Sequence, residues 1–173
     1  SLFDLNFEGK NPLLLSSNVK EENDLLVVDL MNPDFYVGGA LIPRGTLHMS
    51  RFIFLWEGIC YERLRVFNYG AAAVTFELDI KYDADFRDLF EIRGMKRAHR
   101  GKLLEPDIRE RRVVLAYEGL DQVTRRTTVD FSPAPDVLQA HEAIFRLQLG
   151  PKEQRELYLT VCCEEDYLAH PRG

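Results

Sequence analysis

The chain has 173 residues, of which 46% are hydrophobic, so it can form one domain with a buried core and no disulfide or metal to hold it. Its 22 basic and 28 acidic side chains give a net charge of −6, which argues against broad nucleic-acid binding because phosphates require a basic surface. The aromatic content of 11% is too high for a disordered chain.

Strand-length apolar runs dominate the chain. Runs rich in β-branched and aromatic residues occupy residues 25–31, 48–56, 59–67, 113–117 and 123–131. In residues 74–82 apolar and polar side chains alternate strictly, which predicts a strand with one buried face. The same alternation in residues 143–149 and 157–163 predicts a last pair of antiparallel strands joined at Gly150-Pro151. We therefore expect about eight to eleven strands.

Glycine-containing turns separate these runs. They stand at residues 8–9, 57–58, 68–70, 118–119 and 150–151. Such frequent reversals leave no room for crossover helices, so a parallel α/β sheet is excluded. The predicted fold is an all-β, antiparallel two-sheet sandwich forming a single domain over residues 1–173.

One short helix and two long loops complete the predicted fold. Residues 84–93 have apolar side chains at spacings of three and four, including Phe86 and Leu89, and predict a connector helix. Residues 32–46 and 94–107 are rich in glycine, proline or basic residues and predict loops. Long loops on a compact scaffold often carry function.

Known catalytic and cofactor motifs are missing. His141-Glu142 begins like a zinc-binding H-E-x-x-H helix, but Phe145 stands at the second histidine position. There is no G-x-S-x-G, G-x-G-x-x-G or C-x-x-C pattern. We expect no metal and no cofactor.

Carboxylates are the remaining catalytic candidates. Asp85, Asp88 and Glu91 would lie on one face of the predicted helix, and glycoside cleavage uses two acidic groups. The alternative is that they cap the helix or face water. The neighbouring basic segment from Arg93 to Lys102 is either solvated or holds an anion or another protein.

Loop aromatics are the sugar-binding candidates. Phe35 and Tyr36 lie in the first predicted loop, where their rings could stack on sugar rings. Trp56 belongs to the longest apolar run, so we expect it in the core.

The cysteines and the apolar runs bear on compartment. Cys60, Cys162 and Cys163 are odd in number and two are adjacent, so we expect reduced thiols, a buried Cys162-Cys163 pair and a cytoplasmic protein. The longest apolar run is far shorter than a membrane span, and we expect no membrane partner. The chain begins at Ser1 without a methionine, as expected for a piece of a longer polypeptide.

Six blocks carry a family resemblance. They are residues 11–17, 32–34, 41–48, 61–66, 83–95 and 115–121. These blocks resemble, in order, the N-terminal domain of bacterial amylo-α-1,6-glucosidases, which are glycogen-debranching-type glycoside hydrolases. The resemblance implies a β-sandwich ahead of an (α/α) toroid that carries the general acid and base. It also implies that residues of the 85–94 segment and the turn at Arg44 contact that catalytic domain.

Three functions follow as hypotheses. The first is a non-catalytic accessory domain, with no catalytic residue of its own, that packs on the catalytic domain and shapes its glucan cleft. The second is an independent carbohydrate-binding module. The third is a stand-alone glycosidase that uses Asp85, Asp88 or Glu91.

Overall fold

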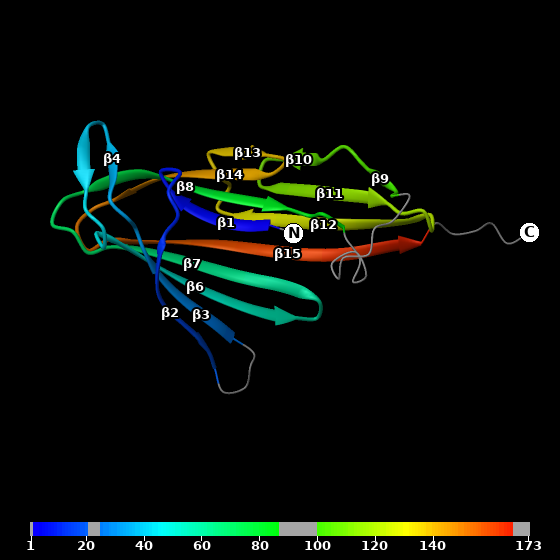
Figure 1. The fold of residues 1–173 in the computed structure, drawn as a ribbon, viewed down its shortest axis with the longest axis horizontal. Helices are drawn as coiled ribbons and strands as arrows, with labels where there is room; N and C mark the ends of the chain where they lie inside the picture. Colours follow the sequence, from blue (N-terminus) through cyan, green and yellow to red (C-terminus); the bar gives the residue numbers. More distant parts are fainter. Residues whose placement is uncertain (1, 21–24, 87–99, 168–173) are drawn as a thin grey trace, which may run out of the picture.

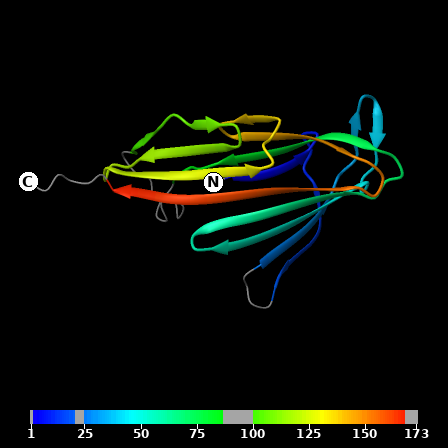
Figure 2. The ribbon, with the colours of Figure 1, turned by 180° about the vertical axis from the view of Figure 1, so that it is seen from behind.

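The chain folds as an antiparallel sandwich of two unequal sheets (Figures 1 and 2). The computed structural model describes residues 2–20, 25–86 and 100–167. These residues form strands and turns and contain no helix. The predicted all-β sandwich is therefore confirmed. Within the same residues, no helix is long and apolar enough to cross a membrane.

The smaller sheet has four strands in the order β1-β8-β14-β13. Their bounds are β1 Leu2–Phe7, β8 Val74–Asp83, β14 Glu142–Leu149 and β13 Val137–Gln139. The alternation predicted for residues 74–82 is confirmed, because Val74, Phe76, Leu78 and Ile80 are all buried while Thr75 is exposed. This sheet therefore buries its apolar face, while its other face is polar and also contains two buried residues, Asn6 and Asp79.

The larger sheet has nine strands, in the order β10-β11-β12-β15-β7-β6-β3-β2, with β9 pairing with β11. Their bounds are β2 Leu13–Val19, β3 Leu25–Met31, β6 Leu47–Trp56, β7 Ile59–Asn68, β9 Lys102–Leu103, β10 Asp107–Arg109, β11 Arg112–Glu118, β12 Val123–Ser132 and β15 Gln154–Tyr167. We call the side of this sheet that faces the smaller sheet its inner face and the opposite side its outer face.

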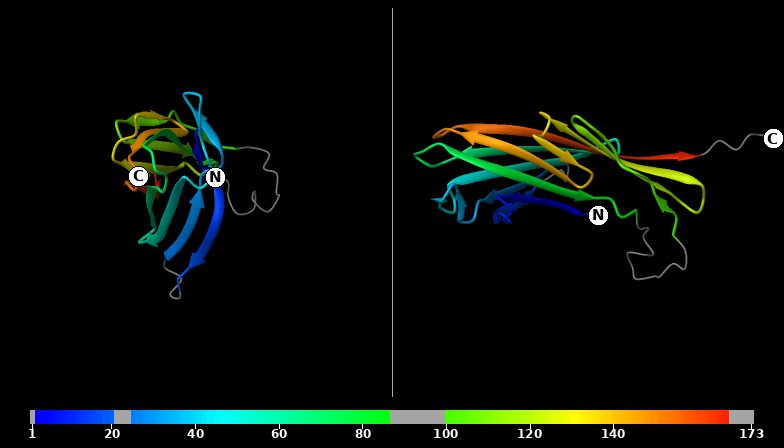
Figure 3. Two further views of the ribbon diagram at one scale, coloured as in Figure 1. Left: turned by 90° about the vertical axis from the view of Figure 1, so that its left-hand side faces the viewer. Right: turned by 90° about the horizontal axis from the view of Figure 1, so that it is seen from above.

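The core lies between the two sheets. Leu47, Met49, Leu64 and Phe131 of the larger sheet are fully buried against Phe76, Leu78 and other residues of the smaller sheet. The end-on and top views show the two layers and the elongated outline of the molecule (Figure 3). The start of β12 and the end of β15 lie beyond the end of β8 (Figure 1).

The predicted pairing of the last two long strands was wrong. β14 pairs with β8 and β13, and β15 pairs with β12 and β7, so consecutive strands lie in different sheets. Asn68, fully buried at the end of β7, stabilises the crossing. Its side-chain Nδ2 donates to the backbone carbonyl oxygens of Leu149 and Gly150 at 3.1 Å. Its backbone carbonyl oxygen accepts from the Lys152 N–H at 2.9 Å.

The first predicted loop is largely a β-hairpin. Strands β4 Phe35–Val37 and β5 Ala40–Ile42 pair across Gly38-Gly39, whose φ values of 55° and 84° suit a two-residue hairpin turn. Asn32 is fully buried at its base, where its Oδ1 accepts from the Leu47 N–H at 2.7 Å. Local pairing therefore replaces the expected loop.

The predicted helix and second loop fall partly on residues that the structure describes. Residues 84–86 form neither helix nor strand, and the rest of the predicted helix, residues 87–93, lies outside the described residues. In the second loop, residues 94–99 also lie outside them, and residues 100–107 contain β9 and the start of β10. Even this segment is thus partly paired with the larger sheet.

Candidate functional site

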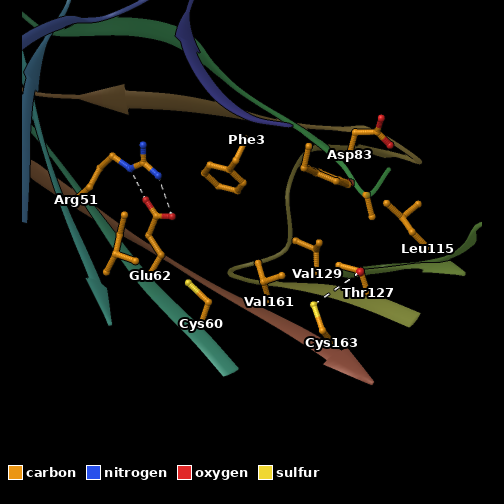
Figure 4. A pocket seen from close by; sticks show the side chains of 13 residues that line it. Phe3, Arg51, Cys60, Glu62, Asp83, Leu115, Thr127, Val129, Val161 and Cys163 are labelled. Atoms are coloured by element: carbon orange, nitrogen blue, oxygen red, sulfur yellow. Dashed lines mark hydrogen bonds and ion pairs between the residues drawn. The ribbon is translucent and has the colours of Figure 1, made fainter. Parts of the chain in front are cut away.

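An apolar groove opens on the inner face of the larger sheet, where the smaller sheet ends. It has a volume of about 420 Å³ and its lining is mainly hydrophobic (Figure 4). We call it the inner groove, and its lining residues are Phe3, Arg51, Ile53, Cys60, Glu62, Tyr82, Asp83, Ala84, Leu115, Thr127, Val129, Val161 and Cys163.

The strands of the core also form the floor of this groove. On β15 the inward positions run Leu157, Leu159, Val161 and Cys163, because every second side chain points to the same face. The first two lie in the core and the last two line the groove. The groove is therefore a continuation of the core that Phe3 of β1 and Tyr82 of β8 border and that the described strands leave open beyond them.

One ion pair stands in the groove wall. The Arg51 Nε donates to Glu62 Oε1 at 2.5 Å, and Arg51 Nη2 donates to Glu62 Oε2 at 3.2 Å. Only 18% of the Arg51 side chain and 7% of the Glu62 side chain are exposed. The Arg51 guanidinium also lies 5.3 Å from the centre of the Phe3 ring. Because each charge is paired, the wall exposes no free charge here.

Two thiols line the same groove on neighbouring strands. Burial, followed by the nearby Glu62 carboxylate, raises the pKa of the Cys60 thiol. The Cys163 Sγ lies 3.8 Å from the Thr127 hydroxyl. All three cysteines of the chain are free. The raised pKa keeps Cys60 protonated near neutral pH, which makes it a poor nucleophile.

A second hollow of about 420 Å³ adjoins the groove and shares Asp83, Ala84 and Leu115 with it. It is more polar, since Asp85, Arg100 and His141 also line it. The His141 Nδ1 lies 3.4 Å from Asp83 Oδ1, and both side chains are at least half exposed. The two hollows together form a continuous surface at the end of β8.

The structure separates the residues that the sequence singled out. Asp85 lines the second hollow, whereas Asp88, Glu91 and Arg93 lie outside the described residues. Tyr36 is 64% exposed on the β4–β5 hairpin, at the opposite end of the molecule from the end of β8 (Figure 1). Arg44 is also exposed there, and its N–H donates to Asp34 Oδ1 at 2.7 Å.

Three expectations about side-chain burial were wrong. Phe35 is fully buried in the core, so its ring cannot stack on a ligand. Trp56 is 63% exposed, because it lies at the end of β6 on the outer face. Cys163 is exposed, since β15 extends beyond the smaller sheet, and Cys162 is half-buried on the outer face.

The Arg51–Glu62 pair was missed from the sequence. Its signal is two ionisable residues that interrupt the apolar runs of residues 48–56 and 59–67 at inward positions. Among the described residues, no group of three or more His, Cys, Asp or Glu side chains is arranged to hold a metal ion. The described site thus offers apolar contact and hydrogen bonding.

The architecture and the groove together define a class, an antiparallel β-sandwich domain with an open apolar end. Residues 1–160 match the family described as the N-terminal domain of some glycogen debranching enzymes, and the chain belongs to this family. The family resemblance stated from the sequence is thereby confirmed. No curated protein matches the chain.

The chain is similar in fold to solved structures. One is a protein assigned as a kojibiose phosphorylase from the human microbiome, with a TM-score of 0.65 and 9% identity, covering 95% of this chain. The chain spans only 22% of that protein's length. A protein assigned as an aldose 1-epimerase from Escherichia coli K12 covers 89% of this chain and 68% of its own, with a TM-score of 0.42 and 9% identity, too low to carry an argument.

Proposed function

We propose that this domain is a non-catalytic accessory domain of a glycogen-debranching-type glycoside hydrolase. It packs on the catalytic domain of the same polypeptide and shapes one side of the glucan cleft. The enzyme acts on α-1,6-glucosidic linkages and works in the cytoplasm, where the three thiols stay reduced.

The inner groove carries this proposal. Phe3, Ile53, Leu115 and Val161 form an apolar wall next to the core, with the paired Arg51 and Glu62 among them. Apolar surface that the described strands leave open in this way is typical of a site where another protein surface packs. Arg51 and Glu62 neutralise each other within this wall, as in the centre of an interface, where unpaired charges are depleted.

The adjoining hollow supports the part of the proposal that concerns the cleft. Asp85, Arg100 and His141 supply hydrogen-bonding groups at the edge of the apolar wall. A partner seated on the groove would place its own surface beside these groups. They would then stand at the rim of the interface, where they could reach a glucan bound by the partner.

The test is to add a charge to the groove of the whole polypeptide. We expect Ile53→Lys to lower hydrolysis of a branched glucan by about tenfold, which corresponds to ~1.4 kcal/mol of lost packing. We also expect it to expose the junction between the domains to limited proteolysis. Ile53 is only partly buried, so the change leaves the core of the sandwich intact.

The matched control is Leu120→Lys, which adds the same charge at a turn residue that is 63% exposed and does not line the groove. Equal activity and equal proteolysis of the two variants would contradict the proposal. The 173-residue chain alone is expected to release no reducing sugar, and release that falls in Asp85→Ala would instead favour a stand-alone glycosidase.

A further inference from the structure

The outer face of the larger sheet carries a second cluster, on the side opposite the inner groove. Every second residue of β6, β7 and β15 points outward there, and many of these residues are aromatic. Phe54 is 44% exposed, Trp56 63% and Tyr158 47%. We call this cluster the aromatic strip, and its members are Phe52, Phe54, Trp56, Tyr61 and Tyr158.

Contacts hold several of these rings in place. Phe54 and Tyr61 stack with their centres 5.0 Å apart and their planes 13° apart. The Arg63 guanidinium lies 4.3 Å from the centre of the Phe52 ring. The Tyr158 hydroxyl donates to the Glu156 carboxylate at 2.5 Å. Stacking a ligand on these rings would cost little side-chain conformational entropy, because their contacts already restrict the rings.

A polar hollow continues the strip across the sheet. The strip borders a hollow of about 450 Å³, and a smaller one of about 270 Å³ shares Tyr61 and Thr160 with it. The smaller hollow is lined by hydroxyl and charged groups, among them Thr128, Asp130 and Glu164. Arg112 lies there too, and its Nη2 is 2.6 Å from Asp130 Oδ2.

The charges on this face balance one another. Around the strip and the polar hollow the charged residues are Arg63, Arg65, Arg112, Asp130, Glu156 and Glu164. Beside them on the same face Arg126 pairs with Asp166. Arg112 pairs with Asp130, and Arg63 lies 3.9 Å from Glu156. The face therefore offers many hydrogen-bond donors and acceptors with little net charge, which suits an uncharged ligand rich in hydroxyl groups.

A sugar chain matches this combination better than a protein surface does. The C–H faces of a pyranose can stack on aromatic rings, while its hydroxyls can bond to guanidinium, carboxylate and hydroxyl groups. The centres of protein interfaces are depleted in charged residues, whereas here charged residues lie beside the rings. The family of this chain is named for enzymes that debranch glycogen, so an α-glucan is the matching polymer.

We propose that the outer face binds an α-glucan chain, with sugar rings stacked on Phe54, Tyr61 and Tyr158 and hydroxyls bonded in the polar hollow. This site goes beyond the accessory role and does not depend on it. It would hold a branched substrate at a distance from the inner groove.

The experiment measures glucan binding by the 173-residue chain. The probes are glycogen in native gels and maltoheptaose in calorimetry, with Trp56 as a fluorescent reporter because it is the only tryptophan. We expect Phe54→Ala and Tyr158→Ala each to weaken binding by about tenfold. Thr160→Val, which removes a hydroxyl from the polar hollow, should weaken it by a smaller factor.

Tyr36→Ala is the matched variant, because it removes a tyrosine that is 64% exposed at the far end of the molecule and so tests the sugar-binding role that the sequence suggested for Tyr36 against the outer site. It should bind glucan as the unaltered chain does, and so should Ile53→Lys, whose change lies on the opposite face of β6. This last variant separates failure of the outer site from failure of the accessory role. Phe54→Leu, which removes the ring but keeps an apolar side chain, replaces Phe54→Ala if the latter unfolds, and it should weaken binding in the same way.

Three results would overturn the proposal. The first is no binding at millimolar maltoheptaose. The second is binding that Phe54→Ala and Tyr158→Ala leave unchanged or that Tyr36→Ala weakens equally. The third is a change of oligomeric state in the strip variants with unchanged glucan affinity, which would assign the face to a protein contact.

Discussion

The inner face of the nine-stranded sheet has two halves formed by the same strands. Under the four-stranded sheet, Leu157 and Leu159 of β15 are 1% and 2% exposed. Farther along the same row, Val161 is half-buried and Cys163 is exposed in the inner groove. The sequence pattern is alike in both halves, but the four-stranded sheet covers only the first of them. Alternation therefore determines which face of a strand is apolar, and the reach of the opposing sheet determines how much of it is buried.

The largest effect should come from the covered half. Leu64→Ala removes a fully buried side chain between the sheets and leaves a cavity. We expect a loss of about 3 kcal/mol in the free energy of unfolding, measured by urea denaturation. A loss below ~1 kcal/mol would mean that the two sheets do not pack closely at this point.

A smaller effect is expected from the ion pair at the edge of the groove. Glu62→Gln leaves Arg51 with a neutral acceptor in a site where little of either side chain reaches solvent. Unfolding free energy should fall by about 1–2 kcal/mol.

The double variant Arg51→Met with Glu62→Leu is the control for this pair. It removes both charges together, so it should recover most of the loss. A double variant that is less stable than Glu62→Gln alone would show that the pair itself, and not an unpaired charge, is what stabilises the wall.

A substitution in the inner groove should lower the free energy of unfolding least. Val161→Ala is expected to cost about 1 kcal/mol or less in the 173-residue chain, because the side chain already reaches solvent. In the whole polypeptide the cost should rise if a partner covers the groove. Equal costs in the two proteins, measured by thermal unfolding, would argue against such a cover.

A chemical probe reports on the same groove through the thiol of Cys60. Alkylation requires a thiolate, and burial and Glu62 raise the pKa of Cys60. The alkylation of Cys60 by iodoacetamide should therefore begin at a higher pH than that of a free thiol, as followed by mass spectrometry. Glu62→Gln removes the second cause and should shift the onset back toward lower pH. An unshifted onset would contradict this assignment.

Much of the fold was predictable because it depends on local alternation. The run at residues 74–82 became β8 with the expected buried face. Pairing across a turn was less predictable. Gly150-Pro151 looks like a hairpin turn, yet Asn68, far away in the sequence, bonds to the carbonyls at this turn while the chain crosses between the sheets. Such a long-range contact has no signal in the local sequence.

The sites were harder to predict, because β6 is apolar on both faces. Residues 52–56 suggested a core strand, but Ile53 faces the groove while Phe54 and Trp56 face outward. Periodicity cannot tell which of two apolar faces another sheet will cover. The prediction that the Phe35 ring is free to bind sugar was wrong for the opposite reason. The segment that looked like a loop is a hairpin, and it turns this ring into the core.

The continuity of β7, β12 and β15 beneath both core and groove has a mechanical consequence. Ladder hydrogen bonds run without interruption from Leu64 to Cys60 and from Phe131 to Thr127, so the uncovered floor shares the stiffness of the buried one. A protein surface that packs in the inner groove therefore contacts a floor that already has its bound conformation. The conformational entropy lost on association would then come mainly from the partner surface, and the sandwich would be the rigid member of the pair.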